Sequence, residues 1–198
     1  ETTACDYVGT FGLQEAAGDA PGEGAVFYLY NDVDQAAYYD SDLSLPGASF
    51  VGAAPGVPPE QVVLIGAALH LAGDGVHVAG MRIITRAGAE TAISAWPSLT
   101  DPVGATAGHL IENVEGFAAD QEMLGSNSIQ SPLKIGPDTV VRNCFFYGHW
   151  DMGFHLELAH GSQFWNNTFI PYQVIGAVMH LEGVENLTFA NNVVLSLS

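Results

Sequence analysis

Two short segments near the end of the chain combine histidine with glutamate, residue types that bind zinc-like ions. They are Phe154-His155-Leu156-Glu157 and Met179-His180-Leu181-Glu182. His155 precedes Asn166 by the same interval as His180 precedes Asn191, so we expect the two segments to stack as neighbouring strands. Alternation then points both histidines and both glutamates outward, about 4.8 Å apart between strands, and His70 could extend the patch.

Two glutamates at that spacing repel each other by about 1–3 kcal/mol. A Zn²⁺-like ion bound to His155, Glu157, His180 and Glu182 would relieve the repulsion, and so would protonated imidazoles, splayed rotamers or water.

A different ion is suggested by two Asp-x-Asp pairs around a tyrosine-rich stretch, Asp32, Asp34, Asp40 and Asp42. Such oxygen-rich loops can hold Ca²⁺, although a turn that exposes its carboxylates has the same pattern. Ca²⁺ and Zn²⁺ therefore both remain candidates.

Aromatic side chains outside the most regular apolar positions form a second candidate surface. Flat apolar rings of this kind can stack on sugar rings, and they can equally anchor loops or fill the core. We therefore expect a polysaccharide contact from some or all of Trp96, Tyr147, Trp150, Trp165 and Tyr172.

The elements that position these residues come from a repeat. An apolar residue, any residue and then Asn or Gly, with another apolar residue about three places later, recurs around Gly80, Asn113, Asn143, Asn166 and Asn191. The last two intervals are nearly equal and too short for paired helices, and the segments are β-branched, aromatic and alternating. Each repeat is therefore a coil of short strands that buries its apolar face only by stacking on its neighbours.

Stacked coils align like residues in columns. We expect Asn143, Asn166 and Asn191 at one left-handed bend, with Phe146, Phe169 and Val194 stacked in the core, and also Val141, Phe164 and Phe189. Two stretches rich in Gly, Pro, Ser and Asn, residues 87–108 and 118–130, are expected to leave the coil as loops.

These coils, Val141-Arg142-Asn143-Cys144-Phe145-Phe146 and Phe164-Trp165-Asn166-Asn167-Thr168-Phe169, resemble the pectin-lyase-like superfamily of right-handed parallel β-helices. Gly12-Leu13-Gln14-Glu15-Ala16-Ala17, followed by Pro21-Gly22, resembles that superfamily's N-terminal entry, where a short helix plugs the solenoid. The expected fold is all-β, a right-handed parallel β-helix with an N-terminal capping helix. Residues 1–60 would form the cap and first strands, and residues 61–198 the coils, which would continue beyond the last residue.

The resemblance implies either uronate lyases, with a Lys or Arg base beside bound Ca²⁺, or hydrolases with paired acidic residues. The sequence departs from both patterns. Arg142 is the basic residue on a well-registered strand, no Asp-Asp pair occurs, and Ala159-His160-Gly161 is a distant echo of the hydrolase Gly-His-Gly. We therefore expect no catalytic residues here, with a polysaccharide lyase or glycoside hydrolase as the alternative if its site is completed outside these residues.

Composition limits the partners. Four basic residues face 22 acidic ones, and a net charge of −18 disfavours nucleic acid. No apolar run is long enough for a membrane span, and the start at Glu1 suggests a processed, secreted or cell-surface product. Cys5 and Cys144 either form a disulfide or remain as thiols, and buried free thiols are the simpler expectation.

The expected function is a non-catalytic structural or adhesive module, with a possible glycan ligand and end-to-end self-association through its unpaired last coil.

Overall fold

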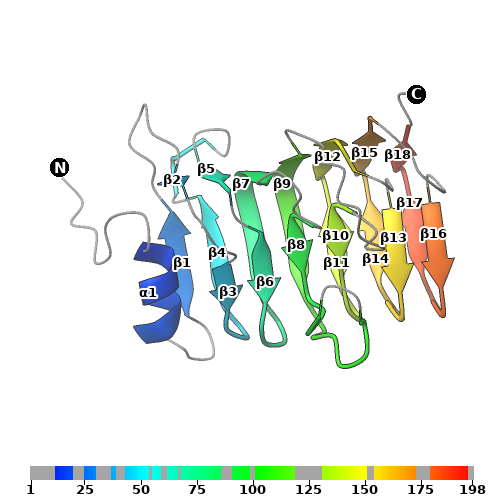
Figure 1. Ribbon diagram of the computed structural model, residues 1–198, viewed down its shortest axis with the longest axis horizontal. Coiled ribbons are helices and arrows are strands. Elements are labelled where there is room, and N and C mark those ends of the chain that lie inside the picture. Colours follow the sequence, from blue (N-terminus) through cyan, green and yellow to red (C-terminus); the bar gives the residue numbers. More distant parts are fainter. Residues whose placement is uncertain are drawn as a thin grey trace, which may run out of the picture.

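The computed structural model is a row of parallel coils stacked along one axis (Figure 1). The described residues are 12–19, 25–29, 37–38, 43–53, 55–58, 62–66, 68–85, 91–98, 101–118, 131–150, 154–172 and 179–195. Among them every pair of named strands is parallel, and strands from successive coils lie side by side. This arrangement is consistent with a β-solenoid.

Each complete coil contributes a strand to each of three faces. The first face is made of β1 (Val26–Leu29), β4 (Phe50–Ala53), the first halves of β7 (His77–Thr85) and β9 (Leu110–Ala118), β11 (Val140–Arg142), β14 (Gln163–Trp165) and β17 (Thr188–Ala190). The second face is made of β2 (Ala37–Tyr38), β5 (Val63–Ile65), the second halves of β7 and β9, β12 (Phe145–Gly148), β15 (Thr168–Pro171) and β18 (Val193–Val194). These two faces form one twelve-stranded sheet, because β7 and β9 run through the corner unbroken.

The third face is made of two smaller parallel sheets. One contains β3 (Leu43–Leu45), β6 (Leu69–Leu71), β8 (Ile93–Ser94) and β10 (Leu133–Lys134). The other pairs β13 (Phe154–Glu157) with β16 (Met179–Glu182), and β13 lies beside β10. The prediction that residues 87–108 form only a loop is wrong at β8, because Ile93 is in the core and pairs with Leu69 and Leu133. So short a strand is held by its neighbours rather than by its own sequence.

The corner between the first and second faces is the predicted asparagine bend. Gly80, Asn113, Asn143, Asn166 and Asn191 all have positive φ, between 53° and 67°. Gly adopts this left-handed conformation freely, and Asn and Asp adopt it at low cost. This explains why Gly or Asn recurs at this position of the repeat. The Asn166 side chain donates to that of Asn143 at 3.4 Å. We call this column the asparagine corner.

A second left-handed corner lies just before each first-face strand from β4 to β17. Its members are Ala48, Gly75, Gly108, Asp138, Gly161 and Asn186, with φ between 53° and 72°. Its residue types vary from coil to coil, so no repeated sequence pattern marks it. It determines where each coil turns from the third face into the first.

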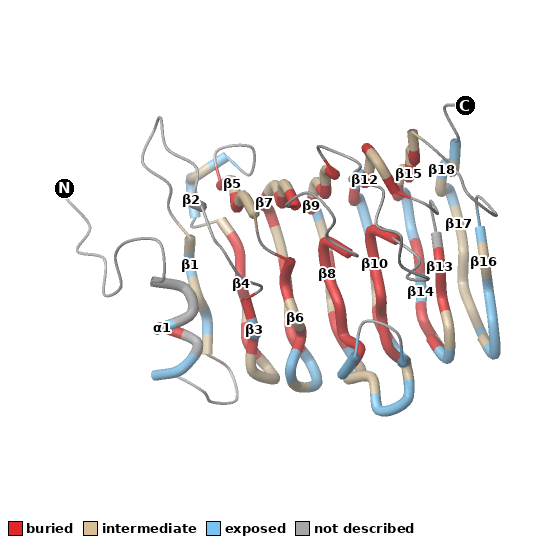
Figure 2. The backbone as a smooth tube through the Cα atoms, in the orientation of Figure 1, coloured by how far each residue is buried: buried red, intermediate tan, exposed pale blue. Residues whose placement is uncertain are grey.

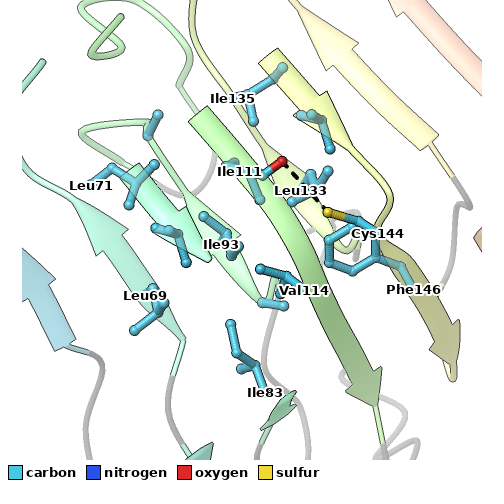
Figure 3. Packing of buried hydrophobic residues seen from close by; sticks show 14 of the residues in the cluster. Leu69, Leu71, Ile83, Ile93, Ile111, Val114, Leu133, Ile135, Cys144 and Phe146 are labelled. Carbon is cyan, nitrogen blue, oxygen red and sulfur yellow. Dashed lines mark hydrogen bonds between the residues drawn. The ribbon is translucent and has the colours of Figure 1, made fainter. Parts of the chain in front are cut away.

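The core lies between the three faces and follows the predicted register. Val141 pairs with Phe164 and Phe164 with Phe189, while Phe146 pairs with Phe169 and stacks on it at a centroid distance of 5.4 Å. Figure 3 shows the interior near β9 and β12, where the Cys144 thiol points toward the carbonyl oxygen of Ile111, 3.7 Å away. Burial raises the pKa of Cys144 to about 12, so it is an unreactive core thiol. Cys5, its proposed partner, lies outside the described residues.

The two ends of the stack differ. Helix α1 (Gly12–Asp19) lies at the N-terminal end near β3, with Ala16 buried. That it serves as a cap stays a prediction. At the other end Figure 2 shows exposure increasing over β16–β18, where Leu181 is 46% exposed although its partner Leu156 is fully buried. Within the described residues, β16, β17 and β18 each pair with a strand on one side.

Candidate functional site

The two histidine–glutamate segments stack as the sequence predicts. His155 of β13 pairs with His180 of β16, and Glu157 pairs with Glu182. Leu156 between them is buried, so alternation directs the histidine and glutamate side chains to the outside of the third face.

Three of these four residues form a compact donor cluster, which we call the His/Glu cluster: His155, Glu157 and His180. One ligand atom from each lies within 4.8 Å of the other two. Nε2 of His155 is 2.6 Å from a Glu157 carboxylate oxygen. Glu182 does not belong to this group; it lies 3.4 Å from Nε2 of His180 and is largely exposed. The structure therefore brings together three of the four predicted ligands and leaves the fourth beside them.

The ring of His155 is fixed by aromatic neighbours on two sides. His180 meets it edge-on at a centroid distance of 4.8 Å, and Trp96 meets it edge-on at 6.1 Å. Trp96 is itself held by an indole hydrogen bond to the Ile135 carbonyl and lies under the Lys134 ammonium at 5.4 Å. Packing thus places an almost completely buried imidazole at the base of an otherwise accessible cluster.

Burial lowers the pKa of His155, and this outweighs the opposing effect of the Glu157 carboxylate. The charges of His180 and Lys134 lower the pKa further. The neutral imidazole that results is the form that can donate a lone pair to a cation.

The donor set suits one of the two candidate ions better than the other. Two imidazoles and a carboxylate match Zn²⁺ and similar transition metals, whereas Ca²⁺ takes six to eight oxygen ligands. The aspartates considered for Ca²⁺, Asp32, Asp34, Asp40 and Asp42, lie outside the described residues. His70 does not extend the cluster, because β8 and β10 separate its strand from β13.

An aromatic stack lies on the outside of the second face, over β9 and β12. Tyr147 stacks on Phe117 and on Phe145, each at a centroid distance of 4.7 Å, and Phe145 is 39% exposed. The Tyr147 hydroxyl donates to Glu115 at 2.6 Å, and Arg82 pairs with Glu115 at 2.7 Å. Burial, then the neighbouring Glu115, raises the pKa of Tyr147 to about 12, so the phenol stays a hydrogen-bond donor. We call these five residues the aromatic strip.

The other predicted sugar-stacking residues are not part of this strip. Trp96 and Trp150 are 3% and 1% exposed, so neither ring can meet a sugar without first moving. Trp165 is 37% exposed but lies on the first face, and Tyr172 packs edge-on against His149 at 5.4 Å. Phe117 was not predicted because its contact with Tyr147 depends on the cross-coil pairing of β9 with β12. Phe145 was not predicted either, although it lies two residues before Tyr147 on β12 and strand alternation places both on the same side.

The charged residues of the first face are engaged with one another. Glu112 accepts from Arg142 at 2.7 Å and lies 2.8 Å from Nε2 of His77. Burial alone would raise the pKa of Glu112, but these partners lower it below its usual value. Arg142 was expected to be the basic residue on a registered strand, yet Arg82 on β7 and Lys134 on β10 occupy registered strands as well.

The segment Ala159-His160-Gly161 has a structural role in the coil. Gly161 is a left-handed corner residue, and Nδ1 of His160 accepts the backbone N–H of Glu185 from the next coil at 3.2 Å. Both interactions shape the turn before β14.

No protein-family model matches the chain, and comparisons with curated proteins and with solved structures found no match. Within the described residues, no helix has the length and apolar character needed to cross a membrane.

Proposed function

We propose that this chain is a non-catalytic β-solenoid module of a secreted or cell-surface protein, and that its aromatic strip binds a neutral polysaccharide. The observation that carries the proposal is the stack of Phe117, Tyr147 and Phe145 beside the Arg82–Glu115 pair. The three-faced coils and the asparagine corner support assigning the fold to the right-handed parallel β-helices of the pectin-lyase-like superfamily.

The strip combines the two kinds of contact that sugars use. The exposed surface of Phe145 offers an apolar platform for the C–H face of a sugar ring. Glu115 and Arg82 are partly exposed and offer an acceptor and donors for hydroxyl groups next to it. The strip follows the stacking direction, because Arg82 pairs with Glu115, and Glu115 with Phe145, across three successive coils. With coils about 4.8 Å apart, such a strip suits an extended chain.

The charge of the molecule narrows the ligand class. A net charge of −18 repels polyanions such as uronate polymers at long range. Neutral polysaccharides incur no such penalty, so the proposal names them rather than acidic ones.

The pairing of charged groups favours binding over cleavage. Arg142 is paired with Glu112, and Arg82 with Glu115. A guanidinium held by a carboxylate keeps its proton and is a poor general base. These contacts support a module that holds a polymer without cutting it, which is the structural or adhesive role expected from the sequence.

The test compares binding to neutral polysaccharides such as xylan, β-glucan and mannan with binding to an acidic one, polygalacturonate. Phe145→Ala should weaken binding to the preferred neutral polymer by about fivefold or more, the equivalent of roughly 1 kcal/mol of lost ring contact. Trp165→Ala is the matched control, because Trp165 is similarly exposed but lies on the first face. Equal binding by Phe145→Ala and the parent would contradict the proposal. New reducing or unsaturated ends in the polymer would instead support the lyase or hydrolase alternative.

A further inference from the structure

We propose that His155, Glu157 and His180 form a binding site for a single Zn²⁺ ion, or a chemically similar divalent transition metal, that fastens the last coil to the one before it. The site lies on the third face, away from the aromatic strip, so the inference does not depend on the proposed function.

The distances in the cluster are close to those that a metal requires. Zinc bonds of about 2.0–2.2 Å in tetrahedral geometry place donor atoms about 3.3–3.6 Å from one another. The ligand atoms of the cluster already lie within 4.8 Å of each other, and the His155–Glu157 pair is closer, at 2.6 Å. The widest gap must therefore close by about 1 Å and the His155–Glu157 pair must open by about 1 Å, changes within reach of rotation of the Glu157 and His180 side chains.

Rigid and adjustable donors are combined in the site. His155 is 4% exposed and is held between the rings of Trp96 and His180. The side chains of His180 and Glu157 are 38% and 26% exposed, so both can rotate toward an ion. Without an ion, Nε2 of His155 and the Glu157 carboxylate are joined by a hydrogen bond. A metal bound to the same two atoms would replace that hydrogen bond.

Electrostatics favours a cation at this position. Glu157 supplies one negative charge to the site, Glu182 stands next to it, and the whole chain carries −18. Lys134 is the nearby opposing charge, and its ammonium is directed over the Trp96 ring. A fourth position remains open to water or to the Glu182 carboxylate.

The ligands come from two successive coils, and this gives the metal a structural consequence. His155 and Glu157 belong to β13, whereas His180 belongs to β16, whose residues are mostly exposed. An ion that binds only the folded arrangement stabilises it by mass action, and here that stabilisation would act on the attachment of β16. Zinc should therefore slow hydrogen exchange of the β16 amides more than that of the central strands β7 and β9.

The binding test titrates Zn²⁺ into tag-free, chelator-treated protein by calorimetry, with Ca²⁺ as a comparison ion. We expect one saturable zinc site per chain and no comparable calcium site. His180→Gln should weaken zinc binding by about 100-fold or more, the upper end of the loss produced by removing even an indirect metal contact. His70→Gln is the matched control, because His70 occupies an outward position on the same face but lies away from the cluster.

Exchange measurements provide the second readout and protect the test against a misfolded variant. His180 is exposed, so His180→Gln should retain the parent's circular dichroism and lose the zinc-dependent protection of β16. A parent chain with no saturable zinc site would overturn the proposal. So would a His180→Gln variant that binds zinc as tightly as the parent, or zinc protection that His70→Gln abolishes.

Discussion

Two adjacent asparagines, Asn166 and Asn167, should lose very different amounts of stability in the same substitutions, because one is kept for its backbone conformation and the other for its side chain. Asn166 is exposed and has φ of 55° at the asparagine corner, where its backbone conformation matters most. Asn167 is 1% exposed, and its side chain points inward. Its Oδ1 accepts the backbone N–H of Cys144, and its Nδ2 donates to the Val141 carbonyl and to Oδ1 of Asn192, each at 2.9 Å.

The magnitudes follow from these contacts. Asn167→Ala leaves the N–H of Cys144 and the carbonyl of Val141 buried without this partner, at about 1–3 kcal/mol for each group. The expected loss in the free energy of unfolding is therefore about 2–6 kcal/mol. Asn166→Ala should cost only about 1 kcal/mol, because it forces Ala into the left-handed region, and Asn166→Gly should fall within about 0.5 kcal/mol of the parent.

Urea unfolding, followed by both far-UV circular dichroism and tryptophan fluorescence, measures these differences through the midpoint and slope of the transition. Asn167→Gly serves as the cross-check, because glycine removes the same side-chain bonds and should cost at least as much as alanine. The assignment of roles would be refuted if Asn166→Gly were as destabilising as Asn167→Ala, or if Asn167→Ala cost less than about 1 kcal/mol.

Three further changes probe the interior and the end of the stack. Cys144 occupies the position equivalent to Asn167 one coil earlier and contacts the Ile111 carbonyl. Cys144→Asn should therefore cost less in urea unfolding than Cys144→Leu, and the reverse order would contradict this. Burial lowers the pKa of His109 below 6.5, so the stability that the neutral imidazole contributes is present above pH 6.5 and is lost as the pH falls below that value. In His109→Gln, urea midpoints measured over this acidic range should therefore depend less on pH than those of the parent. An unchanged dependence would contradict the prediction. Val194 lies in β18 and should contribute to self-association of the chain. Sedimentation should detect more self-association at high salt, where screening weakens the repulsion between acidic chains, and less in Val194→Lys. A parent chain that stays monomeric at high salt would contradict this prediction.

The columns of the solenoid were predictable where the coil length is nearly constant. From Asn143 through Asn166 to Asn191 the intervals are almost equal, so the spacing of like residues predicted the asparagine corner and the pairing of His155 with His180. In these coils, one asparagine with positive φ sets the position at which each coil turns from the first face to the second. Alternation along each strand then determines which side chains point outward.

Earlier in the chain the repeat still placed Gly80 and Asn113 at the corner, but the longer intervals from Gly80 to Asn113 and from Asn113 to Asn143 did not indicate which outward side chains meet. Phe117 and Tyr147 meet only because β9 pairs with β12 across such an interval, and no local pattern in either strand indicates the contact. The two tryptophans at positions 96 and 150 look like surface residues beside Gly and Pro, yet tertiary packing buries both. Indole rings are large enough that covering them outweighs a local turn preference.

Repetition also explains why the proposed metal site lies where it does. Among the described residues, strands in the middle of the stack pair on both sides, whereas β16, β17 and β18 each pair with one strand, and Leu181 is 46% exposed although its partner Leu156 is buried. Local opening should therefore be easiest there. A metal shared between β13 and β16 would add its free energy at that weakest junction, so its effect should be concentrated in the last coil. Zinc that raised protection equally in every strand would point to a general ion effect rather than to the His/Glu cluster.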